Sequence, residues 1–152
     1  MPRITRDAAV QWEGNLARGV GHIDAATSGA FAGLGFSLPS RIGASEGKTS
    51  PEELLAAAHG ACFTMSLANE LTAGGTPPAH IDVRCTITMD EVEGKGHQIV
   101  HSSIAATVVV PGADADALAA AGRLADEGCP FSTLLRNAGA GVEVTTTLEG
   151  GS

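Results

Sequence analysis

Two cysteines of this sequence have surroundings that could support thiol chemistry. Cys62 lies in an apolar run with His59 three residues before it and Ser66 four residues after it, and polar groups beside a buried thiol need a reason. Cys129 directly precedes Pro130, a residue typical of the first helical position, so its thiol falls near a helix N-terminus, where a thiolate is stabilised. Either cysteine could instead serve in packing, since free cysteine is among the most buried residue types.

The remaining cysteine and the possibility of a metal site give weaker signals. Cys85 occupies an inward position of an alternating segment, where a thiol is best interpreted as a small buried hydrophobe. His59 and Cys62 form a His-x-x-Cys pair, but no second compact pair accompanies them. A zinc site needs four ligands at familiar spacings, so we do not expect one.

Length and composition indicate one domain over residues 1–152 with a core of aliphatic side chains, because 43% of residues are hydrophobic and 3% aromatic. A net charge of −8 disfavours binding to nucleic acid. No apolar stretch approaches the roughly 20 residues of a membrane span, and residues 1–14 lack the apolar segment of a signal peptide. We therefore expect a cytoplasmic protein with no membrane or nucleic-acid partner and a small substrate. Structural disulfides are rare in that compartment.

The clearest predicted element is a helix that begins at Pro51. Ser50 is a suitable N-cap, Glu52 and Glu53 place acids in the first turn, and Gly74-Gly75 ends the segment. Its middle is small or apolar on every side, which predicts a central, deeply buried helix whose residues Ala58, Ala61 and Met65 are covered in a homodimer.

The remaining pattern predicts an α+β fold with antiparallel sheet. Alternating apolar residues indicate strands, and capping residues or Gly and Pro mark helix ends and turns. The expected elements are a hairpin within 8–23, a strand over 36–41, strands over 81–90 and 99–110 joined by a turn within 93–96, helices over 114–127 and 129–136, and a last strand over 142–148.

Three segments resemble the OsmC/Ohr family of thiol-dependent peroxidases. Residues 49–71, TSPEELLAAAHGACFTMSLANEL, resemble the family's hallmark helix, and residues 127–136, EGCPFSTLLR, resemble its second cysteine motif. Residues 11–23, QWEGNLARGVGHI, resemble its N-terminal hairpin. Phe36 and Ser40-Arg41, before the helix, are closer to the OsmC branch. The resemblance covers essentially the whole chain.

The resemblance implies an intertwined homodimer in which antiparallel sheets wrap around two long central helices, with active sites at the dimer interface. It implies that Cys62 is the peroxidatic cysteine, that Cys129 is the resolving cysteine, and that the two form a disulfide during turnover. The implied substrate is an organic hydroperoxide and the implied reductant is a dithiol, with a lipoyl-type molecule as a candidate. We expect Cys129, at a junction between a loop and a helix, to be exposed and to suit exchange with that dithiol. No metal, haem or flavin cofactor is needed.

The resemblance also implies that Glu52 holds an arginine that activates Cys62. Glu52 precedes Cys62 by ten residues, or about 15 Å along a continuous helix, so its carboxylate must act through a long side chain from elsewhere. Arg41 matches the OsmC-like arginine, and Arg18 is the alternative, nearer to the Ohr arrangement. A guanidinium beside a buried thiol favours the thiolate and can donate hydrogen bonds to a departing alkoxide.

Two other functions fit the same fold. One is a module that binds a small apolar ligand, although such a module needs neither the cysteine pair nor Glu52. The other is a disulfide-based redox sensor with no significant turnover. Consumption of peroxide separates both from an enzyme.

Overall fold

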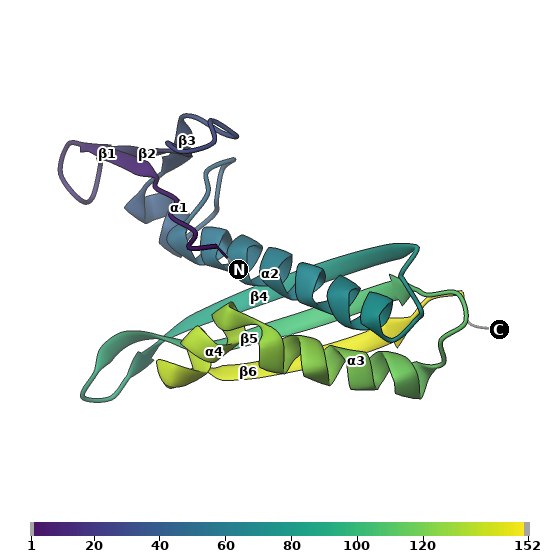
Figure 1. Ribbon diagram of the computed structural model, residues 1–152. Helices are drawn as coiled ribbons and strands as arrows, with labels where there is room; N and C mark the ends of the chain where they lie inside the picture. The colour runs from purple at the N-terminus through teal and green to yellow at the C-terminus, as the bar shows by residue number, and fades with distance from the viewer. Residues whose placement is uncertain (1, 151–152) are drawn as a thin grey trace. The chain divides into compact units, whose positions relative to one another are not determined.

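A computed structural model describes residues 2–150 of the protein, which form an α+β fold (Figure 1). The chain divides into two compact units, Met1–Pro51 and Glu52–Ser152, each with a three-stranded sheet of its own. A single domain over 1–152 therefore stays a prediction. Within residues 2–150, the structure contains no helix that is both long and apolar enough to cross a membrane.

The first unit contains the predicted hairpin and a third strand. β1 (Ala9–Glu13) pairs antiparallel with β2 (Val20–Asp24), which pairs antiparallel with β3 (Leu34–Phe36). The rings of Trp12 and Phe36 lie 5.6 Å apart between centroids, in a tilted arrangement. Gly21 is required beneath the Phe36 ring, because a Cβ atom there would lie 2.2 Å from a ring carbon.

The predicted strand over 36–41 is wrong, since β3 ends at Phe36 and the short helix α1 (Leu38–Ile42) follows. Ser37 has an extended backbone, and its hydroxyl accepts the backbone N–H of Ser40 at 3.2 Å. Pro39 lies in the first turn, where its missing N–H costs nothing. Arg41, expected on a strand, therefore lies in the last turn of a helix.

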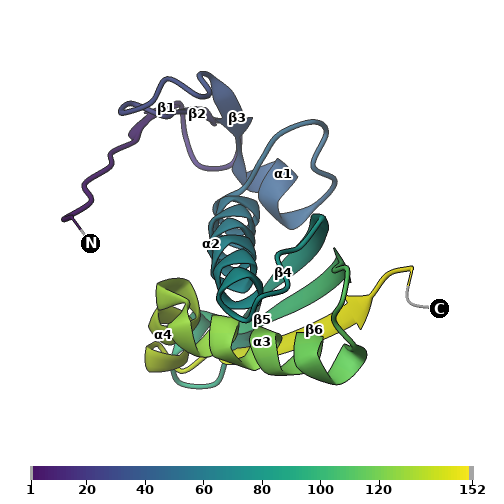
Figure 2. The same ribbon diagram turned by 45° about the vertical axis from the view of Figure 1, so that its right-hand side comes forward.

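The second unit has three helices on one face of its sheet (Figures 1 and 2). The predicted central helix is confirmed as α2 (Pro51–Ala73), which ends directly before Gly74. The other predicted elements of this unit lie within a few residues of their expected bounds. They are β4 (His80–Val92), β5 (Gly96–Val109), α3 (Ala115–Gly128), α4 (Pro130–Asn137) and β6 (Gly141–Leu148).

The expectation of purely antiparallel sheets is wrong for this unit. β4 and β5 form the predicted antiparallel hairpin, but β6 pairs parallel to β5. The connection from β5 to β6 passes through α3 and α4, and such a helical crossover returns the chain in its original direction. The sheet is therefore mixed, with strand order β4-β5-β6.

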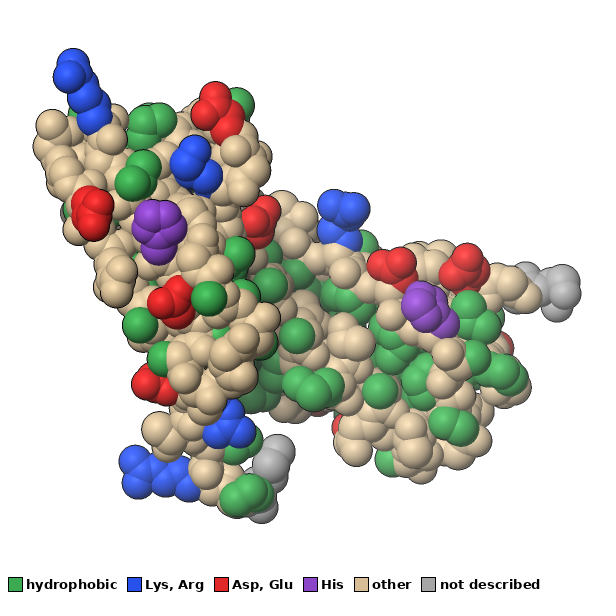
Figure 3. Space-filling model, turned by 90° about the horizontal axis from the view of Figure 1, so that it is seen from above, with side chains coloured by type: hydrophobic (Ala, Val, Ile, Leu, Met, Phe, Trp, Pro, Cys, Tyr) green, Lys and Arg blue, Asp and Glu red, His purple; other side chains and the backbone are tan. Residues whose placement is uncertain are grey.

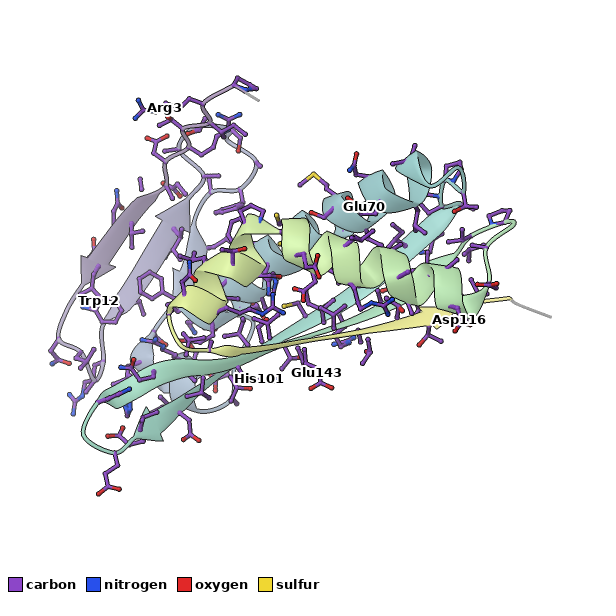
Figure 4. All side chains as sticks on the ribbon, turned by 60° about the horizontal axis from the view of Figure 1, so that its bottom comes forward. Arg3, Trp12, Glu70, His101, Asp116 and Glu143 are labelled. Atoms are coloured by element: carbon purple, nitrogen blue, oxygen red, sulfur yellow. The ribbon has the colours of Figure 1, made fainter. Side chains whose placement is uncertain are left out.

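The faces of this sheet differ in polarity. On the side away from the helices, His101 of β5 and Glu143 of β6 are neighbours, with Nε2 and Oε2 3.8 Å apart (Figure 4). The helix side holds the hydrophobic core. Its buried members are Phe63, Leu67, Leu71, Ile104, Ala106, Val108, Val110, Leu118, Ala121, Ala125 and Cys129.

Helix α2 is less buried in the single chain than its composition suggests. Phe63 and Leu67 are fully buried, but Ala61 is exposed and Met65 is 68% exposed. Apolar side chains are also frequent on the side of the molecule that Figure 3 presents. The expected burial of Ala58, Ala61 and Met65 therefore needs a second chain and stays a prediction.

Candidate active site

The fold brings Cys62 and Cys129 together. Cys62 lies in the middle of α2 and is partly buried, whereas Cys129 is the single residue between α3 and α4. The thiol of Cys129 is close enough to the thiol of Cys62 to raise its pKa, and both thiols are free. Two residues far apart in the sequence thus form a dithiol pair.

The predicted helix N-terminus at Cys129 is confirmed, but the expected exposure of this residue is wrong. Cys129 is the N-cap of α4, with Pro130 at the first helical position, and its backbone N–H donates to the Asp126 carbonyl at 3.2 Å. Its side chain is nevertheless fully buried and belongs to the core. A junction between two helices that pack on a sheet can turn its side chain inward even where the backbone turns near the surface.

The surroundings of Cys62 hold its thiol protonated. Burial raises the pKa of Cys62 to about 11, and the hydrogen bond to Cys129 and repulsion from its sulfur act in the same direction. A backbone hydrogen bond from Phe131, in the first turn of α4, lowers the pKa in part. With a pKa of about 11, only about one thiol in 10⁴ would be ionised at pH 7. A nucleophilic Cys62 therefore requires a further positive group.

Replacing Cys129 with alanine should lower the pKa of Cys62, because two of the causes that raise it disappear. The thiolate fraction at a given pH should then increase, so alkylation of Cys62 by iodoacetamide should reach its half-maximal rate at lower pH. The measurement is the alkylation rate against pH in a Cys85→Ser background, with Cys129 kept as the control. An unchanged midpoint would show that Cys129 does not influence Cys62.

A buried histidine adjoins the dithiol pair. The Nδ1 atom of His59 lies 2.8 Å from the Ser102 hydroxyl, and its Nε2 atom lies 2.8 Å from the Ser132 hydroxyl. All three side chains are fully buried. Burial lowers the pKa of His59, and nearby Arg136 lowers it further, while Asp126 opposes both. The imidazole is therefore neutral near pH 7 and joins α2, β5 and α4.

The sequence pointed to His59 but not to its two partners. Ser132 lies three residues after Cys129 in the first turn of α4, and that spacing was the available signal. Ser102 lies at a buried position of β5 on the same face as Ile104 and Val108, so the strand alternation was the signal that could have found it.

Cys85 lies beside this histidine. Its sulfur is 3.5 Å from the Ser102 hydroxyl and 3.8 Å from Nδ1 of His59, and burial raises its pKa. The expectation of an inward-facing thiol is met in part, since Cys85 packs against the core yet also lines an open groove of about 540 Å³ with Gly60 and Ala61. Its raised pKa makes it a weak nucleophile.

The charged residues expected at the site are divided between the two units. Glu52 lies in the first turn of α2 and opens the second unit. Arg41, on α1, and Arg18, in the turn after β1, belong to the first unit and are both exposed. The backbone N–H of Arg18 donates to the side-chain oxygen of Asn15 at 3.0 Å. A pairing of Glu52 with either arginine stays a prediction.

The metal-ligating side chains are dispersed. Across the described part of the chain, no group of three His, Cys, Asp or Glu side chains is placed to hold a metal ion.

Sequence comparison places this chain among redox proteins. The family model described as OsmC-like protein matches residues 43–145. The chain is 34% identical over 133 residues to Peroxiredoxin OsmC of Escherichia coli (strain K12), covering 88% of this chain and 91% of the relative. The Shigella flexneri protein of the same name matches equally well.

Solved structures share the fold. An organic hydroperoxide resistance protein OsmC from Legionella pneumophila matches with a TM-score of 0.68 at 21% identity, covering 96% of this chain and 98% of that one. An organic hydroperoxide resistance protein from Elizabethkingia anophelis matches with a TM-score of 0.71 at 20% identity, covering 97% and 98%. At these identities the likeness establishes the fold alone.

Proposed function

Since the chain belongs to the OsmC-like protein family, we propose that it is a thiol-dependent peroxidase that reduces organic hydroperoxides to alcohols. The observation that carries the proposal is the proximity of the Cys62 and Cys129 thiols, which is close enough for Cys129 to raise the pKa of Cys62. A peroxide takes two electrons, and two adjacent thiols can supply them by forming a disulfide. The name of the Escherichia coli relative, Peroxiredoxin OsmC, supports the same chemistry.

The proposed cycle has three steps. The Cys62 thiolate attacks the distal oxygen of the hydroperoxide, the O–O bond breaks, and the alkoxide takes a proton and leaves as an alcohol. Cys62 is then a sulfenic acid, and the Cys129 sulfur attacks it to form the disulfide and release water. A dithiol reductant then restores both thiols and becomes a disulfide itself.

Activation of Cys62 is assigned to Arg41, held by Glu52. The site as described raises the pKa of Cys62, so a guanidinium is needed to favour the thiolate and to stabilise the departing alkoxide. Arg18 is the alternative source of that charge.

The reductant should attack the disulfide at Cys62. Cys129 is fully buried, whereas Cys62 is only partly buried, and thiol–disulfide exchange requires access to the attacked sulfur. This replaces the expectation that an exposed Cys129 receives the reductant.

A steady-state assay tests the proposed function. Cumene hydroperoxide and hydrogen peroxide are each supplied with dihydrolipoamide, dithiothreitol or glutathione, and we expect the highest kcat/KM for cumene hydroperoxide with a dithiol. Formation of one disulfide per chain without turnover would indicate a redox sensor instead. Absence of both disulfide and turnover would favour a ligand-binding module.

The protein should be a homodimer in solution, because α2 exposes Ala61 and Met65 on a helix whose composition is typical of burial. Light scattering should give about twice the chain mass of 15.2 kDa. Met65→Glu should weaken the dimer, while Leu124→Glu, a control at an exposed apolar residue of α3, should not. A stable monomer of the unmodified protein would contradict the prediction.

A further inference from the structure

We propose that His59 is a positioning residue. It holds α4, and with it Cys129, at the position relative to Cys62 that disulfide formation requires. The inference rests on the proposed peroxidase function, because it concerns the step in which Cys129 resolves the oxidised Cys62. His59 does not touch the peroxide in this scheme. It acts through the hydroxyl of Ser132.

The spacing of the residues supports this role. His59 precedes Cys62 by three residues on α2, so the two side chains lie about one helical turn apart on neighbouring parts of that helix. Ser132 follows Cys129 by three residues in α4. The hydrogen bond between His59 and Ser132, 2.8 Å long, therefore joins the same two segments that carry the thiols, about one turn away from them.

The second serine fixes the imidazole itself. Ser102, on β5, occupies the Nδ1 side at 2.8 Å while Ser132 occupies the Nε2 side. A neutral imidazole has one N–H donor and one acceptor nitrogen, so one hydroxyl accepts and the other donates. With both nitrogens engaged, the ring cannot rotate without losing a buried hydrogen bond, and neither nitrogen is available as a general base for the peroxide.

A second set of contacts holds the segment around Cys129 against α3. Arg136, in the last turn of α4, pairs with Asp126 of α3 at 2.5 Å, and the Asp126 carbonyl accepts the N–H of Cys129. These contacts tie α4 to α3, whereas the bond between His59 and Ser132 ties α4 to α2. The backbone N–H of Phe131 also bonds to the Cys62 thiol, but the bond between His59 and Ser132 joins α2 to α4 without using a reacting sulfur.

Disulfide formation is sensitive to this geometry. A disulfide requires Cβ atoms roughly 3.5–4.5 Å apart and a dihedral angle near 90°. A displacement of about 1 Å can slow a positioned reaction by about a hundredfold. If α4 were released from α2, the sulfenic acid on Cys62 would persist, and a second peroxide would oxidise it to the sulfinic acid.

Two matched substitutions test the proposal. Ser132→Ala and Ser102→Ala each remove one buried hydroxyl from the same imidazole, but only Ser132→Ala breaks the link to α4. Each protein, the unmodified chain included, is mixed with one equivalent of cumene hydroperoxide and quenched over time, and intact mass follows the sulfenic acid and the disulfide. Thermal melting shows whether the two variants are folded to the same extent.

We expect similar rates of sulfenic acid formation in all three proteins. Disulfide formation should be about tenfold or more slower in Ser132→Ala than in Ser102→Ala. Under excess peroxide, Ser132→Ala should accumulate the sulfinic form, about 32 Da heavier through two added oxygens. Ser132→Thr, which keeps a hydroxyl, should recover most of the rate.

Equal slowing in the two alanine variants, or an unchanged rate in Ser132→Ala, would overturn the proposal. A parallel series with diamide, which drives dithiols to disulfides without a peroxide, separates this inference from the proposed function. If peroxide fails to oxidise Cys62 in the unmodified protein but diamide still reveals the difference between the variants, the peroxidase function fails and the positioning role stands. If peroxide oxidises Cys62 normally and neither reagent reveals a difference, only the positioning role fails.

Discussion

Replacing Cys62 with serine should abolish even a single turnover with cumene hydroperoxide, whereas replacing Cys129 with serine should leave the first step intact. Cys62 is the partly accessible sulfur of the pair, and Cys129 is fully buried behind it. We therefore expect a hydroperoxide to react at Cys62 rather than at Cys129. A serine at position 62 offers an alcohol in place of the thiolate that the reaction requires.

Intact mass after one equivalent of peroxide distinguishes the two roles. The unmodified protein should lose about 2 Da as the disulfide forms, and Cys129→Ser should gain about 16 Da as Cys62 becomes a sulfenic acid. Cys129→Ser should thus consume about one equivalent per chain and then stall or over-oxidise. Cys62→Ser should show neither change. A gain of 16 Da in Cys62→Ser, with none in Cys129→Ser, would reverse the assignment.

Cys85→Ser is the matched control for this pair of variants. Its sulfur contacts Ser102 and packs against the core, so its loss should change the thermal melting temperature more than the turnover. The same mass changes as in the unmodified protein are expected after one equivalent of peroxide. A loss of the disulfide in Cys85→Ser would show that Cys85 takes part in the reaction.

Elements defined by local signals were predicted well from the sequence. The bounds of α2 follow from a proline at its first position and a glycine pair after its last. β4 was predicted from the alternation of apolar and polar residues, because one face of the strand is exposed to solvent and the other packs on helices. Ser37 and Pro39 are also local signals for the start of α1. Alternating apolar residues nearby nevertheless favoured the incorrect strand.

Features that depend on tertiary structure could not be predicted from local sequence signals. The direction of β6 depends on the crossover through α3 and α4, and no residue of β6 itself encodes it. The burial of Cys129 depends on how α3 and α4 pack on the sheet. The sequence alone left the pairing of the two cysteines open, and it was the family resemblance that implied it. The partners of His59 became visible only once three separate elements were placed around it.

The arginine proposed to activate Cys62 gives the second large expected effect. Arg41→Ala should lower kcat/KM for cumene hydroperoxide by about a hundredfold or more, which corresponds to about 2.7 kcal/mol of transition-state stabilisation. The surroundings of Cys62 raise its pKa to about 11, so loss of the compensating charge should leave the thiol protonated. The missing guanidinium would also no longer stabilise the alkoxide as the O–O bond breaks.

The pH dependence of the activity that remains in Arg41→Ala shows why activity is lost. If Arg41 favours the thiolate, the activity of Arg41→Ala should increase as pH rises toward 11, because thiolate then forms without help. Arg41→Lys should recover part of the activity, since it keeps the charge but loses the planar fork that pairs with a carboxylate. Glu52→Gln should also lower kcat/KM for cumene hydroperoxide. Arg18→Ala is the matched control at another exposed arginine of the first unit and should have a mild effect. A severe loss in Arg18→Ala with a mild one in Arg41→Ala would transfer the activating role to Arg18.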